Sequence, residues 1–309
     1  MLSALRGGNL LGFLSQLAYN SGILSKFAVV IEVSMEKNDL VSVIMPSYNA
    51  GEFLSGSIES ILAQTHRNLE LLITDDASTD QVTIDLLHHY EQLDSRVKVE
   101  YLTQNQGAGN ARNCSIKRAK GRFIAFCDCD DRWTDDKLDH QLAFMEERNC
   151  ALSCSSYLIC KGDYQVIGIN IPPKVIDFNM LKRDNKIGCL TAIYDTHMLG
   201  KKFYMPNIRK RQDWALFLNI LMQCGRCYAY LDKPLAYYNL RGNSISHSKI
   251  KLVKYNIAIY REVLGFNTIK SLAYFFFLFL PSYTAKMLKR RNDSKRYIAA
   301  NRPAILDKR

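Results

Sequence analysis

The chain has 309 residues, of which 48% are hydrophobic and 23% charged, and its formal net charge is +11. This hydrophobic content suffices for a large packed core and excludes an intrinsically disordered protein. The segment 249–309 contains 14 Lys and Arg but only 3 Asp and Glu, whereas the first 248 residues carry 27 of each sign. A neutral main part excludes a globally basic nucleic-acid binder, so no nucleic-acid partner is expected. The basic tail favours a local anionic partner such as phospholipid headgroups.

The first segment, residues 1–37, lacks the uninterrupted apolar run and small-residue cleavage site of a signal peptide. We predict an N-terminal extension that is poorly ordered or lies upstream of the natural start, for which Met35 is the candidate; a lipid-facing helix is the alternative. The nine cysteines are odd in number and scattered, which favours reduced buried thiols. Cys224 and Cys227 form a lone Cys-x-x-Cys without the second ligand pair of a zinc site.

From residue 40 onward, strands and helices alternate. Short apolar, β-rich runs predict strands over 40–45, 69–74, 97–102 and 123–126, and helices are predicted over 53–63, about 80–90 and 111–119. Alternation at this spacing predicts an α/β fold with a doubly wound, mostly parallel sheet flanked by helices. We expect a catalytic domain over residues 38–248 and a helical C-terminal extension over residues 249–309.

Three carboxylates follow the last of these strands, in the sequence Asp128-Cys129-Asp130-Asp131. In open α/β sheets, ligands bind at the carboxyl ends of the strands. Mg²⁺ and Mn²⁺ bind one or two carboxylates together with substrate phosphates. We therefore predict that Asp130 holds a metal on a diphosphate and that Asp128 binds a ribose hydroxyl. A solvated turn or a helix N-cap is the alternative interpretation.

Other polar residues at the same predicted edge suit a nucleotide. Asp76 follows the second strand and is able to accept the imide N–H of uracil, while Tyr48 follows the first strand and is able to stack on the base. Arg112 lies at the start of a predicted helix, where it would meet the base or the phosphates. An N-cap role for Asp76 and a surface ion pair for Arg112 are the alternatives.

Four ordered motifs together resemble family 2 inverting glycosyltransferases of the GT-A fold. They are Val41 to Asn49 (VSVIMPSYN), Thr74 to Asp80 (TDDASTD), Gly107 to Asn113 (GAGNARN) and Asp128 to Asp131 (DCDD), and the resemblance covers about residues 40–245. It implies that the nucleotide is bound by Pro46, Tyr48, Asn49, Asp76, Arg112 and Asp128. It also implies a divalent cofactor, Mn²⁺ or Mg²⁺, on Asp130.

The resemblance further implies a catalytic base, which Arg211-Gln212-Asp213-Trp214 supplies. Asp213 would lie at the start of an apolar helix, whose dipole also favours an acid there. Gln212 stands where many relatives have Glu. The Gln-x-x-Arg-Trp signature of processive synthases is absent, which favours transfer of a single sugar. A later loop resembles the Tyr-rich segment of the family, and Arg241 or His247 would reach the diphosphate or the metal from it.

The function implied is transfer of one sugar from a nucleotide-sugar donor, favoured as a UDP-sugar, to a saccharide acceptor. General base catalysis by Asp213 in a single displacement would invert the donor to a β-linkage. The acceptor is expected to be a lipid-linked, polyprenyl-diphosphate saccharide of bacterial polysaccharide biosynthesis (O-antigen, capsule or exopolysaccharide). Alternatives are an inactive nucleotide-binding scaffold and a nucleotidyltransferase; the latter is disfavoured because no Gly-rich motif follows the first strand.

The tail predicts where the protein acts. The ten-residue run 272–281 is intensely apolar but too short to cross a bilayer, which takes about 20 residues. Six basic residues follow it: Lys286, Lys289, Arg290, Arg291, Lys295 and Arg296. This combination is typical of an interfacial helix on anionic lipid, although a helix packed on the catalytic domain is the alternative. We expect a cytoplasmic enzyme, peripheral at the inner face of the cell membrane.

Overall fold

The computed structural model describes residues 40–162, 164–240 and 249–301. The predicted N-terminal extension (1–37) and the two loop residues Arg241 and His247 lie outside the described residues. The first part of the chain alternates as predicted: β1 (Val41–Ser47), α3 (Phe53–Leu62), β2 (Leu69–Asp75), α4 (Gln81–Leu93), β3 (Val97–Tyr101), α5 (Ala108–Arg118) and β4 (Phe123–Phe126). These strands pair in parallel, in the order β3-β2-β1-β4.

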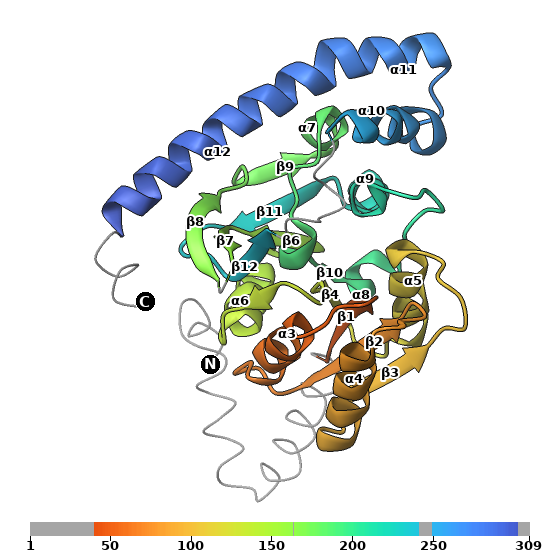
Figure 1. The fold of residues 1–309 in the computed structure, drawn as a ribbon. Coiled ribbons are helices and arrows are strands. Elements are labelled where there is room, and N and C mark those ends of the chain that lie inside the picture. The colour runs from red at the N-terminus through yellow and green to blue at the C-terminus, as the bar shows by residue number, and fades with distance from the viewer. Residues whose placement is uncertain (1–39, 163, 241–248, 302–309) are drawn as a thin grey trace, which may run out of the picture.

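The middle of the chain completes two sheets. It forms β5 (Arg132–Trp133), α6 (Lys137–Arg148), β6 (Leu152–Ser155), β7 (Tyr157–Lys161), β8 (Gln165–Asn170), β9 (Val175–Asp177), α7 (Phe178–Arg183), a 3₁₀ turn (Cys189–Thr191), β10 (Ile193–Asp195), α8 (Thr196–Leu199), α9 (Gln212–Cys224), β11 (Arg226–Tyr230) and β12 (Ala236–Leu240). The eight-stranded sheet has the order β3-β2-β1-β4-β10-β6-β11-β9, and a smaller sheet has the order β5-β12-β7-β8. Antiparallel β10 joins the parallel half to β6 (Figure 1).

The main sheet is covered on both faces, which the alternating side chains of β1 require. Val43 and Met45 belong to one core cluster with apolar residues of α3, such as Ile58. Ile44 points the other way, into a second cluster with Ile116 of α5 and residues of α9. All nine cysteines lie in the described part of the chain and are free thiols, of which five are buried and four half-buried.

Two element boundaries differ from the prediction at places that matter for the site. β1 continues through Pro46 to Ser47, because the carbonyl of Ser47 accepts the N–H of Asp76 (2.8 Å) and extends the pairing with β2. α5 begins at Ala108 and not at Ala111. Gly107, with φ of 93°, turns the chain directly into the helix, and its carbonyl accepts from Ala111 (3.2 Å). Only glycine adopts this backbone conformation without strain.

The C-terminal segment packs on the catalytic part of the chain. It forms α10 (Lys249–Ala258), a π-helical turn (Ile259–Val263), α11 (Thr268–Tyr274), a second π-helical turn (Phe275–Phe279) and α12 (Leu280–Ala300). Phe279 lies in the main core with its ring 5.8 Å from that of Trp214 in α9. At the far end of α12, Ser294 Oγ accepts the N–H of Ile169 in β8 (3.0 Å). Figure 1 shows α12 running along the edge of the molecule beside β8.

Among the described residues, no helix has the length and apolar character needed to span a bilayer. The apolar run 272–281 is instead divided between two environments. Phe275 and Phe279 are buried in the core, whereas Phe276 and Phe277 are 56% and 78% exposed. These two rings complete the core around Trp214, so this side of the run packs on the catalytic part of the chain, while the interfacial contact with lipid stays a prediction. The boundary predicted at residue 248 stays a prediction.

Candidate active site

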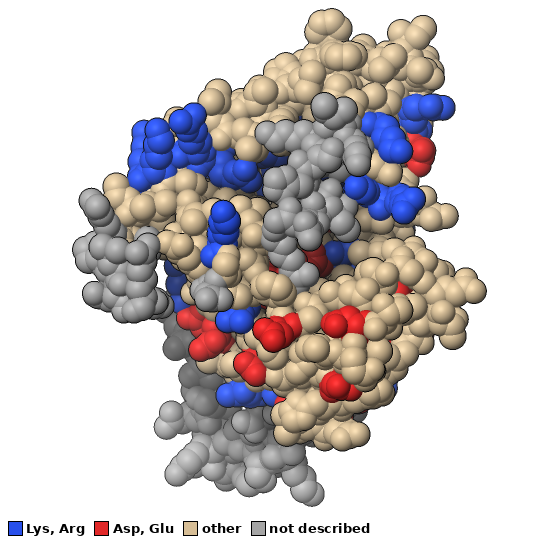
Figure 2. Space-filling view, viewed as in Figure 1, with Lys and Arg blue, Asp and Glu red and all other residues tan. Residues whose placement is uncertain are grey.

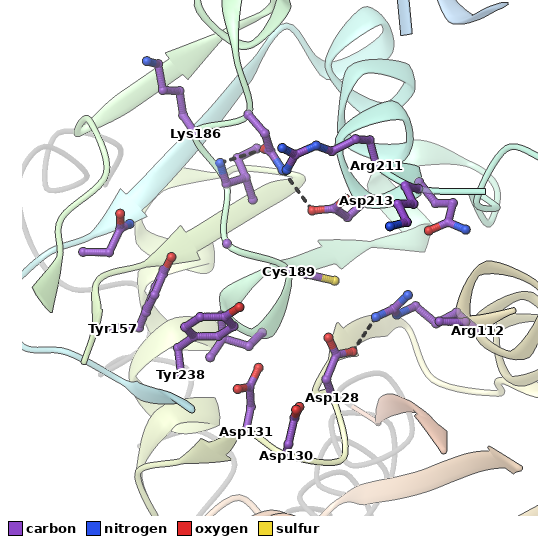
Figure 3. Close-up of a pocket in the computed structure, with 18 of the residues that line it drawn as sticks. Arg112, Asp128, Asp130, Asp131, Tyr157, Lys186, Cys189, Arg211, Asp213 and Tyr238 are labelled. Carbon is purple, nitrogen blue, oxygen red and sulfur yellow. Dashed lines mark hydrogen bonds and ion pairs between the residues drawn. The ribbon is translucent and has the colours of Figure 1, made fainter. Parts of the chain in front are cut away.

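A cleft of about 1230 Å³ lies at the carboxyl ends of the parallel strands. It is bordered on one side by the loops after β1, β2 and β4 and on the other by the start of α9 and by α12. Figure 3 shows Asp128 and Asp130 on the first side and Asp213 on the second. Seven of the eight described residues predicted for the site line it: Pro46, Tyr48, Asp76, Arg112, Asp128, Asp130 and Asp213. Residues that are far apart in sequence thus meet at one sheet edge, the place where α/β folds bind ligands.

The carboxylates after β4 have different surroundings. Asp128 forms an ion pair with Arg112 Nη2 (2.5 Å). Asp131 is buried, and its Oδ1 accepts the N–H of Asn239 in β12 (3.1 Å), so this side chain joins the two sheets. Asp130 lines the cleft, and its carbonyl accepts the hydroxyl of Tyr164 (3.0 Å). All three carboxylates line the cleft, and Asp131 is the one that also binds the second sheet.

Arg112 is held inside the protein as a permanent cation. Its side chain extends from α5 and the residue is 8% exposed. Burial opposes its charge, but the attraction of nearby Asp128 outweighs this and raises the pKa of Arg112. Its Nε is buried and finds no hydrogen-bond partner among the described residues. An unpaired buried donor is costly unless a ligand accepts from it, which fits an anionic or acceptor-rich ligand in the cleft.

Asp76 organises the Gly-rich loop at the mouth of the cleft. Its two carboxylate oxygens accept the N–H groups of Gln106 (2.8 Å) and Gly107 (2.7 Å). The predicted alternative, an N-cap role for Asp76, is wrong, because Asp80 caps α4 by accepting from Thr83 N (3.1 Å). Asp76 thus lines the cleft and fixes the start of α5, and each of its oxygens keeps a second lone pair.

Asn49 does not line the cleft. Its Oδ1 accepts the N–H groups of Thr79 (2.9 Å) and Asp80 (3.0 Å), and its own N–H donates to Ser78 Oγ (2.9 Å). The side chain therefore braces the loop after β2 against the loop after β1. It supports the wall near Tyr48 and Asp76, while its predicted contact with a nucleotide stays a prediction.

The predicted base, Asp213, lies in the first turn of α9 and faces the cleft (Figure 3). Trp214, the next residue, is 1% exposed and anchors the helix in the core. Asp213 Oδ2 accepts a hydrogen bond from Asn185 Nδ2 (2.9 Å), and Asn185 Oδ1 in turn accepts from Ile187 N (3.1 Å). Asn185 therefore fixes the orientation of the Asp213 carboxylate, a role that no motif in the sequence indicates.

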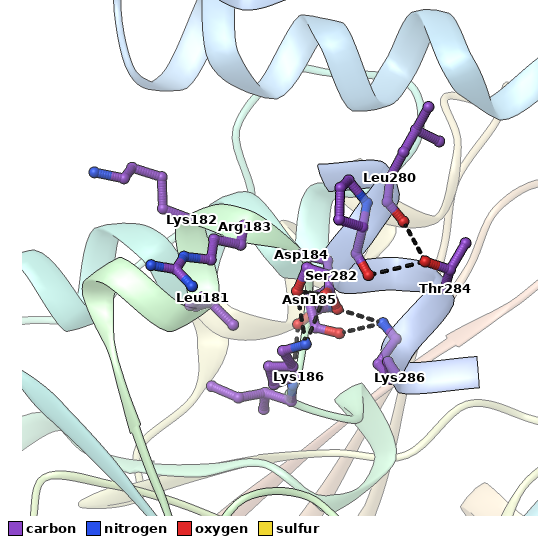
Figure 4. Close-up of polar contacts among 12 residues, drawn as sticks. Leu181, Lys182, Arg183, Asp184, Asn185, Lys186, Leu280, Ser282, Thr284 and Lys286 are labelled. Atoms are coloured by element: carbon purple, nitrogen blue, oxygen red, sulfur yellow. Dashed lines mark hydrogen bonds and ion pairs between the residues drawn. The ribbon is translucent and has the colours of Figure 1, made fainter. Parts of the chain in front are cut away.

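A buried ion cluster connects this region to α12 (Figure 4). Asp184, whose side chain is 0% exposed, pairs with Lys186 (2.6 Å) and with Lys286 of α12 (2.6 Å), and it also accepts from Ser282. Lys286 Nζ also donates to the carbonyl of Asn185 (2.7 Å). The helix thereby holds the loop that carries Asn185.

Three of the six basic residues that follow the apolar run are turned toward the catalytic part of the chain. Lys286, Lys289 and Arg290 line the cleft. This face of α12 lies against the cleft because the buried carboxylate of Asp184 requires cationic partners, and Lys286 is one of them.

The oxygen ligands at this turn suit a hard divalent cation whose remaining coordination positions are filled by a substrate. Within the described ranges, no group of three or more His, Cys, Asp or Glu side chains is arranged to hold a metal ion. Mg²⁺ and Mn²⁺ keep several waters and use one or two carboxylates plus substrate phosphates. Asp130 and its neighbour Asp128 line the cleft beside the Arg112 guanidinium, so oxygen ligands are available where a diphosphate would lie.

The fold and the cleft together are those of a glycosyltransferase. The chain belongs to glycosyl transferase family 2, whose profile matches residues 42–236. The putative teichuronic acid biosynthesis glycosyltransferase TuaG of Bacillus subtilis (strain 168) is 43% identical to it over 225 residues, which are 72% of this chain and 88% of the relative. WfgD of Escherichia coli, a UDP-Glc:alpha-D-GlcNAc-diphosphoundecaprenol beta-1,3-glucosyltransferase, is 39% identical over 215 residues, 70% of this chain and 83% of the relative.

Solved structures confirm the predicted GT-A fold. S. aureus TarS 1-349 in complex with UDP-GlcNAc superimposes with a TM-score of 0.61 at 21% identity, covering 79% of this chain and 72% of that chain. The mannosyltransferase PcManGT from Pyrobaculum calidifontis, in complex with GDP-Man and Mn2+, gives a TM-score of 0.57 at 16% identity, covering 86% and 80%. At these identities the likeness concerns the fold alone.

Proposed function

We propose that this glycosyltransferase moves one sugar from a UDP-sugar to a hydroxyl of a lipid-linked saccharide, inverting the donor to a β-linkage. The observation that carries the proposal is the cleft, which gathers Asp76, Arg112 and Asp128 on one side and Asp213 on the other. WfgD, a relative, is named as using UDP-Glc and a diphosphoundecaprenol-linked acceptor to form a β-linkage, which supports the donor, acceptor and stereochemistry proposed here.

The residues of the cleft have separate roles in this proposal. Tyr48, which is half exposed at the rim, stacks on the base, and Asp76 accepts the imide N–H of uracil. Arg112 offers its unpaired Nε to the nucleotide. Asp128 accepts from a ribose hydroxyl. Pro46 shapes the floor beside Tyr48 where β1 ends.

The chemical step needs one base and a stabilised leaving group. Asp213 takes the proton of the acceptor hydroxyl while that oxygen attacks the anomeric carbon from the face opposite the nucleotide. Asn185 holds the carboxylate in place through its hydrogen bond (2.9 Å). A divalent cation bound at Asp130, Mn²⁺ or Mg²⁺, would supply Lewis-acid stabilisation of the diphosphate. Arg241 and His247, in the part of the sequence after β12, are proposed to contribute as well.

The donor assignment predicts selective, metal-assisted binding. We expect one UDP-sugar, out of a panel of UDP-, GDP- and dTDP-sugars, to bind measurably in calorimetric titrations with Mn²⁺ or Mg²⁺. Asp130→Asn should weaken that binding about tenfold in metal but little in chelator, because the lost carboxylate acts through the cation. Asp131→Asn is a poor control because Asp131 joins two sheets, so Asp135→Asn in an exposed turn serves instead.

The outcome of this titration separates the enzyme from its alternative. Binding of a UDP-sugar without turnover on any lipid-linked saccharide would support the inactive scaffold. Absence of binding by every nucleotide sugar, with metal present and the protein folded, would refute the proposed function.

We also propose that the protein acts in the cytoplasm, peripheral at the inner face of the membrane, where its acceptor lies. Four exposed apolar residues in and near α11 support this location: Ile269, Leu272, Phe276 and Phe277. Together with basic residues of α12 they form the kind of surface that binds at an anionic lipid interface.

Liposome flotation tests this location with the full-length protein, because the C-terminal helices are part of the core. Phe276→Ser with Phe277→Ser should reduce binding to anionic liposomes at least about tenfold, since each exposed ring adds roughly 1.5–3 kcal/mol on burial in lipid. The matched control is Leu93→Ser with Met222→Ser, two other exposed apolar residues. Equal flotation of both double variants would contradict the membrane proposal.

A further inference from the structure

One wall of the cleft is strongly cationic, and only some of its charged groups form ion pairs or hydrogen bonds with other described residues. Five basic residues form this wall, which we call the cationic wall: Arg209, Lys210, Arg211, Lys289 and Arg290. Four carboxylates lie on the opposite side, after β2 and β4: Asp76, Asp128, Asp130 and Asp131. In Figure 2, most of the acidic side chains in view lie on the lower part of the molecule, and most of the basic ones lie above them.

The contacts of the cationic wall with other described residues leave most of its hydrogen-bond donors available. Arg290 makes no hydrogen bond or ion pair with any described residue. Lys289 donates to the carbonyl of Ile171 (3.1 Å) and pairs with Asp293 (2.7 Å) one turn along the same exposed helix face. Arg211 uses Nε to donate to Asn256 (3.0 Å), which leaves its two terminal nitrogens. These residues contrast with Lys186 and Lys286, which are occupied by buried Asp184.

The cationic wall lies next to the proposed base. Arg209 to Arg211 immediately precede α9, in whose first turn Asp213 stands. From the other side, Lys286 donates to the carbonyl of Asn185, and Asn185 donates to Asp213. Lys289 and Arg290 follow Lys286 by one turn of α12, on the part of the helix that lines the cleft. Asp213 and these cations therefore line one cleft, so an acceptor whose hydroxyl meets Asp213 shares that cleft with them.

We propose that the cationic wall binds the diphosphate of the acceptor, at a subsite distinct from the one for the donor diphosphate. This inference rests on the proposed function and deepens it. In a saccharide carried on a polyprenyl diphosphate, the first sugar is bonded directly to the diphosphate. When the reacting hydroxyl belongs to that sugar, the anionic group lies one sugar ring away from it, inside the cleft that Asp213 shares with Lys289, Arg290 and Arg211. An arginine guanidinium binds two phosphate oxygens at once, and a lysine ammonium adds a compact positive charge.

Two other sources of phosphate need to be distinguished. Anionic headgroups would attract every exposed cation of α12, including Arg291 and Lys295, which do not line the cleft. The donor diphosphate would compete for the cationic wall, so UDP and the acceptor diphosphate would exclude each other. The proposed subsite instead requires dependence on Lys289 and Arg290 alone and simultaneous binding with UDP.

Calorimetric titration of the full-length protein with farnesyl diphosphate, in saturating UDP and at fixed ionic strength, tests the subsite. Lys289→Gln with Arg290→Gln should weaken binding at least about tenfold, because two charge-assisted contacts are lost. Arg291→Gln with Lys295→Gln removes the same charge from the same helix and should change the affinity less than about twofold. Surface pairs on this helix contribute little to folding, so both variants should remain folded.

Each outcome decides the proposal. Equal loss in the two variants would assign the effect to general attraction by the basic helix and overturn the subsite. No loss in either variant, or displacement of UDP by farnesyl diphosphate, would overturn it as well. Binding of UDP is measured first in all three proteins. Its absence would refute the proposed donor, while the same titrations without UDP would still compare the two variants and test the cationic wall.

Discussion

Replacing Asp213 by Asn is expected to lower the turnover number by about 10²- to 10⁴-fold, the contribution typical of a positioned general base. The affinity for the nucleotide-sugar donor should stay within about twofold of that of the wild type, because Asp213 lies across the cleft from the residues proposed to bind the nucleotide. An amide oxygen at position 213 still accepts from Asn185, so the variant removes basicity and leaves the local geometry in place. Steady-state transfer and donor titration measure the two quantities.

The matched control for this change is Asp139→Asn. Asp139 is also an acid in the first turn of a helix, α6, but it does not line the cleft. Loss of either charge removes a favourable interaction with the helix dipole, worth roughly 0.3–1 kcal/mol, so thermal unfolding should respond similarly in the two variants. Turnover by Asp213→Asn within about threefold of the wild-type rate would remove Asp213 from the role of base.

The part of the site that is predictable from sequence is the part that follows strands. Asp76 and Asp128 stand one or two residues after buried apolar runs, and parallel strands bring their carboxyl ends to one edge. Local patterns therefore suffice to place them together. The ends of elements are less predictable. The apolar pattern places the start of α5 at residue 111, but Gly107, with its positive φ, lets the helix begin three positions earlier, at Ala108.

The rest of the site depends on contacts across long sequence separations. Asn185 and Asp184 follow a short helix and carry no motif, and their partners Asp213 and Lys286 are 28 and 101 to 102 positions away. No local periodicity encodes such pairs. One signal for the packed tail does exist in the sequence: Phe275, Phe279 and Tyr283 recur every four residues. In the structure they form a continuous stack, with ring centroids 5.3 and 5.6 Å apart.

Replacing Lys286 by Met should destabilise the folded protein by about 3 kcal/mol and also lower turnover. Removing one partner of a buried ion pair leaves an uncompensated charge, which typically costs about 3–5 kcal/mol. Lys186 and Ser282 still reach Asp184 and keep the loss at the low end of this range. Turnover falls because Lys286 also holds the carbonyl of Asn185, the residue that orients Asp213. Urea unfolding and steady-state kinetics measure the two effects.

The pH dependence of the stability lost in Lys286→Met identifies the origin of that loss. Burial alone would raise the pKa of Asp184, but Lys286, Lys186 and Ser282 outweigh burial and hold that pKa below its ordinary value. A lowered pKa gives stability that is present above the unfolded-state value, about 3.9, and is lost as the pH falls through the folded-state value. The Lys286→Met variant has less of this stability to lose, so its difference from the wild type should be largest near pH 7 and shrink below about pH 4.

Two further variants separate the ion cluster from simple packing of α12. Lys295→Met removes an exposed cation from the same helix and should change stability by less than about 0.5 kcal/mol. The double change Asp184→Asn with Lys286→Met removes the buried charge together with its partner, and it should be more stable than Lys286→Met alone. A double variant as unstable as the sum of its two single changes would mean that Lys286 acts through its aliphatic stem. The loop of Asn185 would then be held by packing and not by charge.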